Sequence, residues 1–331
     1  MPDDPGPRTR AHSRAWWAAP AGVVGVLALA VLAMRLPEEP AGSSPTTASW
    51  VVTASASAAA SPPGEPGATP NPGPGLRPVV SGRDRGCREP VLRVLQFNIH
   101  FGVSRAGDID PNRIAAEIRA RRPDLVSLNE VDSRTLRTGR VDEAGYLARA
   151  TGLRAIYGPN LLWDGGLFGN AILTRFPVVE SQNLALPGVA GLEPRGLLTA
   201  TVRVGGRDVT FSSTHLSDGS DGRVSRTWEA EAIANVLRHA TGPTIVAGDL
   251  NSRPHDVPVR ILRQYLLDSQ HLGGVGRGDT VPETDPEGRI DYVLYDSHLA
   301  VVPGSTRVLP SASSDHPAVF TKLALLPDHS C

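Results

Sequence analysis

Thiols are scarce in this sequence of 331 residues, which has two cysteines, Cys87 and Cys331. Neither lies within the polar motifs described below, so a metal site built from thiolates is disfavoured. The two cysteines bracket the C-terminal part of the chain. In an oxidising compartment we expect them to form one disulfide that holds the C-terminal tail beside the first strand, and two free thiols are the alternative.

An excess of positive charge is also absent. Lys322 is the only lysine, and 33 basic residues face 34 acidic ones, for a formal net charge of −1. This balance provides no polybasic field that would capture nucleic acid over a long range. A local basic groove or a bound metal ion could still bind phosphates.

The N-terminal quarter differs from the remainder. Residues 15–34 carry no charge and are long enough for a helix that crosses a bilayer. Arginines precede this run, so the positive-inside rule predicts a signal anchor with residues 1–14 in the cytoplasm and the rest of the chain outside. A cleaved signal peptide, which would leave a secreted protein, is the alternative. Residues 35–86 are rich in Pro, Ala and Ser and predict a disordered linker before a domain over 87–331.

Within that domain, apolar alternation and short apolar runs predict strands at 91–99, 124–131, 169–175, 197–204, 207–216, 244–251, 289–295, 299–302 and 318–325. Helical spacing predicts helices between Pro111 and Pro123 and at 146–150, 223–239 and 258–267. Gly205-Gly206 indicates a hairpin. Hairpins mixed with strand-helix-strand crossovers predict an α/β fold of mixed sheets covered by helices.

Polar side chains stand at or beside the ends of many of these strands. They are Asn98, Glu130, Asn170, His215, Asp249, Asn251, Asp291, Asp315 and His316. Carboxylate and amide oxygens are hard donors that suit Mg²⁺, Mn²⁺ or Ca²⁺. A hard ion beside histidines fits the hydrolysis of phosphate esters, in which a cation neutralises phosphate oxygens and a base activates water.

Function explains some of these residues better than structure does. A charged side chain at the end of a buried strand is unfavourable unless it takes part in binding or catalysis. This argument applies to Glu130, Asp249 and His316. Asn170 and Asp315 could instead be turn or capping residues. Arg195 is a candidate phosphate clamp, with a solvated surface arginine as the alternative.

Seven motifs in sequence order resemble those of the endonuclease/exonuclease/phosphatase superfamily. They are Gln96–His100, Asn129–Val131, Gly169–Leu173, Ser213–Leu216, Gly248–Asn251, Arg289–Tyr292 and Ser314–Pro317. That superfamily includes pancreatic-type DNases, abasic-site endonucleases, bacterial sphingomyelinases and inositol polyphosphate phosphatases. The resemblance covers residues 91 to 325 and implies a four-layer α/β/β/α sandwich with the site at one edge of its two sheets.

The resemblance also implies a role for each motif residue. Asn98 and Glu130 would hold the divalent ion, with Asp315 beside it. Asp249 and Asn251 would orient the attacking water and a phosphate oxygen. Asp291 would set the tautomer of His316, which acts as a general base or stabilises the phosphate. His215 would contact the phosphate or protonate the leaving group, and Asn170 would line the pocket.

Two positions depart from the family pattern. His100 stands where many family nucleases have an aspartate, which weakens the case for a second metal ion. Asn129 precedes the metal-binding glutamate where the family usually has glutamine.

We therefore expect a membrane-tethered, extracytoplasmic, metal-dependent phosphoesterase that cleaves phosphodiester or phosphomonoester bonds. Its expected substrates are phospholipid head groups or lipid-linked phosphates. The alternatives are a nuclease acting on extracellular DNA or RNA and a non-catalytic module that binds phosphate ligands. No obligate protein partner is evident, and we expect a monomer.

Overall fold

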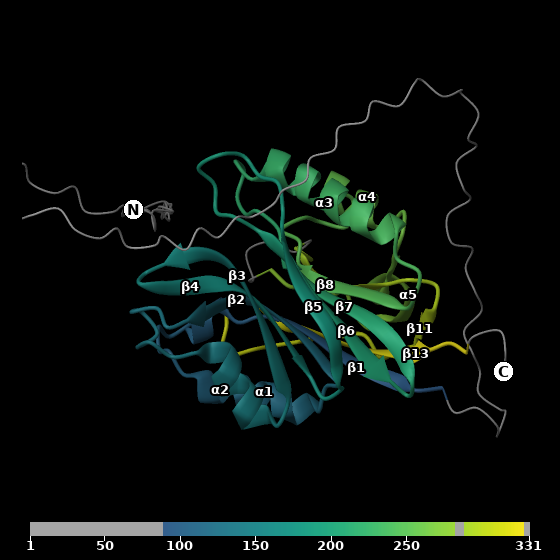
Figure 1. Cartoon of the computed structure of the whole chain (residues 1–331), viewed down its shortest axis with the longest axis horizontal. Coiled ribbons are helices and arrows are strands. Elements are labelled where there is room, and N and C mark those ends of the chain that lie inside the picture. The colour runs from purple at the N-terminus through teal and green to yellow at the C-terminus, as the bar shows by residue number, and fades with distance from the viewer. Residues whose placement is uncertain (1–88, 282–287, 328–331) are drawn as a thin grey trace, which may run out of the picture. The chain divides into compact units, whose positions relative to one another are not determined.

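The computed structural model describes residues 89–281 and 288–327 (Figure 1). The predicted tail, membrane helix and linker and both cysteines lie outside these ranges, so the anchor and the disulfide stay predictions. No helix within the described ranges combines the length and the apolar character needed to cross a membrane.

The first sheet has seven strands in the order β11-β13-β1-β2-β4-β3, with β12 paired to β13. Its strands are β1 Val91–Asn98, β2 Leu125–Ser133, β3 Arg154–Trp163, β4 Gly166–Thr174, β11 Leu299–Val301, β12 Arg307–Leu309 and β13 Ala318–Leu325. Strands β1 and β2 are parallel, and the other pairs are antiparallel.

The second sheet has six strands in the order β5-β6-β7-β8-β10-β9. Its strands are β5 Val178–Ala185, β6 Gly196–Val204, β7 Arg207–His215, β8 Thr244–Asp249, β9 Leu267–Asp268 and β10 Asp291–Tyr295. Strands β7 and β8 form its parallel pair. Each sheet thus has one parallel pair in its interior, and the carboxyl ends of each such pair meet at one edge.

Helices cover the outer face of each sheet (Figure 1). Helices α1 (Pro111–Arg121) and α2 (Glu143–Thr151) lie on the first sheet, and α3 (Arg223–Arg238) and α4 (Val257–Leu262) lie on the second. A 3-10 turn, η1 (His100–Gly102), follows β1, and the short α5 (Ser269–Gly273) follows β9. The start of α1 is set by the Asp110 carboxylate, which accepts from the Asn112 amide, and by Pro111 in the first turn.

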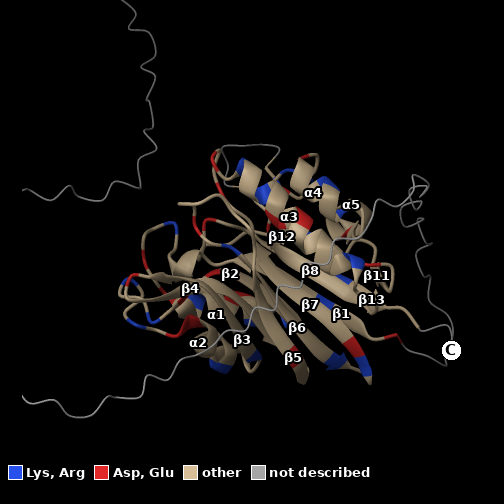
Figure 2. Cartoon of the chain, turned by 45° about the horizontal axis from the view of Figure 1, so that its top comes forward, with Lys and Arg blue, Asp and Glu red and all other residues tan. Residues whose placement is uncertain are grey.

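Period-two alternation produces the layers. In β1, Leu92 and Val94 face the core between the sheets, whereas Leu95 and Phe97 face α1 and α2. In β8, Ile245 and Ala247 face the core between the sheets, whereas Val246 faces α3 and α4. The predicted four-layer α/β/β/α sandwich is confirmed. Figure 2 shows acidic and basic residues in both helical layers, as the balanced charge implies.

Several local predictions need correction. The helix expected at 258–267 ends at Leu262, and turns lead from there to β9 at Leu267. The short elements β9, β12 and α5 and the strands β3 and β5 were not predicted. Strands β3 and β5 each stand at the end of a sheet and are largely exposed, so burial does not impose apolar alternation, and β3 includes Pro159, which an edge strand tolerates.

Candidate active site

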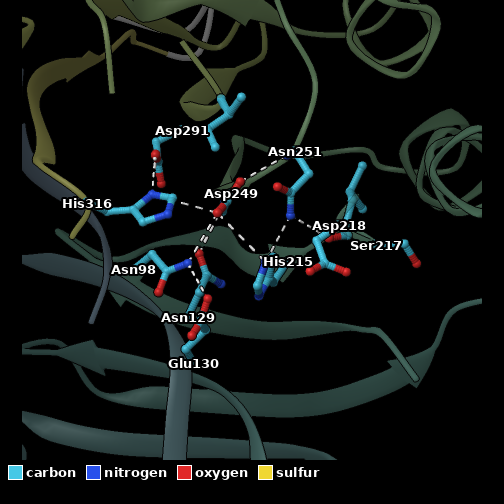
Figure 3. A network of polar contacts seen from close by, with 12 residues as sticks. Asn98, Asn129, Glu130, His215, Ser217, Asp218, Asp249, Asn251, Asp291 and His316 are labelled. Carbon is cyan, nitrogen blue, oxygen red and sulfur yellow. Dashed lines mark hydrogen bonds and ion pairs between the residues drawn. The ribbon is translucent and has the colours of Figure 1, made fainter. Parts of the chain in front are cut away.

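Asp249 lies at the centre of a polar cluster between the two sheets (Figure 3). Its Oδ2 accepts from Asn98 Nδ2 at 3.1 Å and lies 3.7 Å from both His215 Nε2 and His316 Nδ1. Its Oδ1 accepts from the Asn251 backbone amide at 2.9 Å. Burial raises the pKa of Asp249 to about 7, to which the Asp291 charge adds while His316 opposes it.

The strand pairing explains why these residues meet. Asn98 is opposite Asn129 in the first parallel pair, and His215 is opposite Asp249 in the second. Gly248 permits the close approach of β7 and β8, since a Cβ there would lie 1.9 Å from the Thr214 carbonyl oxygen. The glycine of the Gly248–Asn251 motif thus has a geometric cause.

Glu130 reaches the site through a β-bulge. In β2 the pairing with β4 shifts between Leu128 and Val131, and Glu130 has φ +58°. Val126, Leu128 and Val131 all face the helices. Without the bulge, regular alternation would place residue 130 on this buried face in place of Val131, so the bulge turns Glu130 away from it. Its Oε1 accepts from Asn98 Nδ2 at 2.9 Å. A left-handed backbone conformation at a non-glycine residue costs about 1–3 kcal/mol of folding free energy, and such conformations cluster at functional sites.

Asn129 joins the two sheets beneath the site. Its Oδ1 accepts from Gln96 Nε2 (2.7 Å) and from the Asp249 amide (3.0 Å), and its Nδ2 donates to Asn170 Oδ1 and to the Thr214 carbonyl (both 2.9 Å). Gln96 also donates to Asp291 Oδ1 at 3.3 Å. The shorter amide at 129 therefore has a full set of partners. We did not predict Gln96, although it shares the face of β1 that carries Asn98.

Asp291, which is buried, pairs with His316, which is partly buried. His316 Nδ1 is 3.0 Å from Asp291 Oδ2, and the two residues arrive from β10 and from the loop before β13. Burial of the imidazole lowers its pKa, but the charge and hydrogen bond of Asp291, with smaller effects of Asp249 and Asp315, raise it to about 11. His316 is therefore an imidazolium near neutral pH. Ser314 holds its backbone, because the serine Oγ accepts from the His316 amide and donates to the Asn98 carbonyl.

His215 has the opposite electrostatic character. Arg195 Nη1 is 3.0 Å from His215 Nδ1, and because a guanidinium only donates, Nδ1 accepts. Burial lowers the pKa of His215 well below its usual value, and Arg195 and His316 lower it further. With Nδ1 accepting, the neutral ring carries its proton on Nε2, which is 3.7 Å from Asp249 Oδ2 and 3.0 Å from Asn251 Nδ2, a donor that cannot accept this proton. Asn251 Nδ2 itself donates to the Leu216 carbonyl at 2.9 Å.

Arg195 is 5% exposed and lies behind His215. Its Nη1 is also 2.6 Å from Glu193 Oε1, an ion pair whose angles do not make a hydrogen bond, and its Nη2 is 3.7 Å from Asp218. This burial excludes the solvated surface arginine that was the alternative, and the phosphate clamp stays a prediction, since the groups that Arg195 contacts in the structure are this histidine and two carboxylates. Its burial could not be anticipated from the sequence, since it depends on the loop between β5 and β6.

Asn170 and Asp315 occupy different positions. Asn170 is buried and links β4 to β6 through a bond from its Nδ2 to the Gly196 carbonyl at 3.1 Å. Asp315 is partly exposed, and its Oδ1 is 3.3 Å from His100 Nδ1. Thus His100, which stands where the family has an aspartate, contacts Asp315, which we expected beside the metal ion.

The donor set fits a hard divalent cation. One oxygen of Asp249, one of Asp291 and a nitrogen of His316 all lie within 4.8 Å of one another. However, Asp291 and His316 already bind each other, so Asn98 and Glu130 are the better candidates to hold an ion. Carboxylate and amide oxygens are the ligands that Mg²⁺, Mn²⁺ and Ca²⁺ prefer.

A four-layer sandwich with carboxylates, amides and histidines at one edge defines the class of DNase-like phosphoester hydrolases. The model of the Endonuclease/Exonuclease/phosphatase family matches residues 95–316, and the chain belongs to this family.

Solved structures agree with this assignment. An endonuclease/exonuclease/phosphatase from Beutenbergia cavernae is 29% identical, with a TM-score of 0.62 over 72% of each chain. A mannosyl-6-phosphatase from Bacteroides thetaiotaomicron is 20% identical, with a TM-score of 0.57 over 70% of this chain and 99% of that one. The human Nocturnin catalytic domain is 22% identical, with a TM-score of 0.56 over 71% and 93%. The last two show the fold alone.

A curated relative is the protein cwh43 of Schizosaccharomyces pombe. It is 29% identical over 166 residues, which cover 50% of this chain and 17% of cwh43. The match therefore concerns a small part of that protein.

Proposed function

We propose that this protein is a divalent-metal-dependent phosphoesterase that acts on phosphoesters at a membrane surface. The observation that carries the proposal is the position of Asp249, which lies between a neutral and a protonated histidine and beside the oxygen donors Asn98 and Glu130. Two histidines in opposite protonation states allow separate roles toward one phosphate.

The side chains divide the chemistry among them. Asp249, with a pKa of about 7, accepts a proton from the attacking water as the base. The His316 imidazolium, held by Asp291, stabilises charge on the phosphate oxygens. The Nε2–H of His215 donates to a phosphate or leaving oxygen. Glu130 and Asn98 would hold the ion, which neutralises phosphate charge when bound.

The membrane part of the proposal depends on the predicted anchor at 15–34. An anchor on the outer face would keep the site near lipid phosphates, and the balanced charge of the chain offers nucleic acid no long-range attraction. We therefore favour phospholipid head groups or lipid-linked phosphates as substrates.

A substrate screen tests the proposal. The purified full-length chain in detergent with Mg²⁺ would be offered sphingomyelin, a polyprenyl phosphate, inositol phosphates, DNA and RNA. Asp249→Asn would control for contaminating activity, and Glu231→Gln, an exposed carboxylate on α3, is the matched substitution. We expect lipid phosphoesters to be cleaved by wild type and Glu231→Gln only.

Faster cleavage of DNA or RNA than of any lipid would overturn the substrate assignment. A folded protein that cleaves none of these substrates would overturn the enzymatic proposal in favour of a binding module.

A further inference from the structure

A pocket of about 840 Å³ lies between the amino-terminal turns of α3 and the loop that leads into α4. Its lining includes Arg223, Arg226, Trp228, Ser252, Arg253 and Asp256. None of these residues belongs to the polar cluster around Asp249.

The charge of this pocket is positive. Three arginines and one carboxylate line it, and the 16-residue α3 begins at Arg223, after the N-cap residue Gly222, which offers no side-chain cap. The unpaired amide groups of a first helical turn favour anions. Burial lowers the pKa of Arg226 and the Arg223 charge lowers it further, whereas the carboxylates of Glu229, Asp256 and Asp218 oppose the shift.

Ser252 supplies an independent sign of a ligand. This residue is 2% exposed, and its Oγ has no hydrogen-bond partner among the described residues. A buried hydroxyl without a partner costs about 1–3 kcal/mol. A serine that lines a basic pocket and lacks a partner is accounted for if a ligand oxygen binds it.

The rim of the pocket is apolar. Val224, Trp228 and Val257 are 51%, 43% and 44% exposed, although they are large hydrophobic residues. A ligand that combines an oxyanion with an apolar group would therefore match both parts of the surface.

The pocket is continuous with the site loops. Ser252 follows Asn251 directly, and Arg226 Nη1 donates to the carbonyls of Ser217 (2.6 Å) and Gly219 (2.9 Å), in the loop after His215. Figure 3 shows Ser217 and Asp218 on the Asn251 side of the cluster.

We propose that this pocket binds a second oxyanion of the phosphate type, carried by a ligand whose apolar part lies on Trp228. That this ligand is the substrate rests on the proposed function, whereas the binding does not. The oxyanion belongs either to an anionic lipid head group or to a soluble phosphate.

Trp228 fluorescence provides the test, on the full-length chain in detergent with EDTA so that metal-dependent turnover is absent. The probes are dihexanoyl phosphatidic acid, dihexanoyl phosphatidylcholine and inorganic phosphate, and Trp228→Phe identifies the signal. Arg223→Gln and Ser252→Ala are the variants. Arg238→Gln, an exposed arginine in the last turn of α3, is the matched control.

We expect saturable binding of phosphatidic acid, with a Kd that rises about tenfold or more in Arg223→Gln and at least about threefold in Ser252→Ala. Arg238→Gln should stay within about twofold of wild type. Inorganic phosphate binding as tightly as phosphatidic acid would support a soluble source, and weaker binding would support a lipid source.

Equal Kd values in Arg223→Gln and Arg238→Gln, or phosphatidylcholine binding as tightly as phosphatidic acid, would overturn the inference. If phosphatidic acid binding depends on Arg223 but the protein cleaves no phosphoester, the proposed function is refuted and the binding pocket stands. If the protein cleaves phosphoesters but phosphatidic acid binding does not depend on Arg223, the binding pocket is refuted and the proposed function stands.

Discussion

Replacing Asp291 by asparagine should change the pH dependence of catalysis. The substitution removes a charge but keeps the shape of a side chain that is 1% exposed and 3.0 Å from His316 Nδ1. At that distance and an effective dielectric constant of about 20, the lost attraction is about 5 kcal/mol, equivalent to a fall in pKa of about 4. The pKa of His316, about 11 in the wild type, should then lie near neutrality.

The consequence follows from the role of the imidazolium. In the wild type His316 stays protonated from pH 5 to 9, whereas in the variant its protonated fraction should fall about 50-fold between pH 7 and 9. If the imidazolium stabilises the phosphate, kcat/KM of Asp291→Asn should decline over this range relative to wild type.

The assay is the hydrolysis of bis(p-nitrophenyl) phosphate with Mg²⁺ from pH 5 to 9, joined to a ¹⁵N-histidine NMR titration. Asp296→Asn is the matched control, because Asp296 pairs with His298 at 2.9 Å outside the cluster. An NMR titration in which His316 has the same pKa in wild type and Asp291→Asn would refute the electrostatic reasoning. Identical pH profiles would refute the catalytic role.

The other predictions concern the second histidine, a buried acid and the core. Arg195→Gln should raise the pKa of His215, because Arg195 lowers it, and should reduce kcat by about tenfold or more; unchanged ¹⁵N shifts of His215 would contradict this. Glu143 is 1% exposed, and burial raises its pKa to about 8. Since the folded state then binds more protons than the unfolded state, stability should fall as pH rises from about 5 to 8, by up to about 1.4 kcal/mol per pH unit. Urea unfolding of Glu143→Gln should lack this slope, and an equal slope in both proteins would exclude Glu143 as its source. Phe97→Ala, in the core beneath α1 and α2, should lower the free energy of unfolding by about 3–5 kcal/mol, and a loss below about 1 kcal/mol would show that Phe97 is not well packed.

The sequence was enough to predict the four layers, because burial imposes an apolar pattern on the strands that form them. Strands such as β1 and β8 are covered on both faces and carry the apolar pattern that predicted them. Asp249 and His316 were recognised as candidate site residues, because a charge beside the end of such a strand is unfavourable unless it takes part in binding or catalysis.

The remaining features depend on tertiary contacts. Whether Arg195 faces solvent or His215 depends on the β5–β6 loop, where the Leu186 amide donates to the Arg195 carbonyl at 2.9 Å. The bulge at Glu130 is visible only in the pairing of β2 with β4. Asn129 and Gln96 lie in the interior between the sheets, and only the packing of one sheet on the other reveals their partners.

The dependence of hydrolysis on a divalent ion tests the central claim most directly. EDTA should abolish hydrolysis of bis(p-nitrophenyl) phosphate by the full-length chain, and Mg²⁺ or Mn²⁺ should restore it in wild type but not in Glu130→Gln. Hydrolysis by wild type that persists in EDTA, or full recovery in Glu130→Gln, would contradict the account.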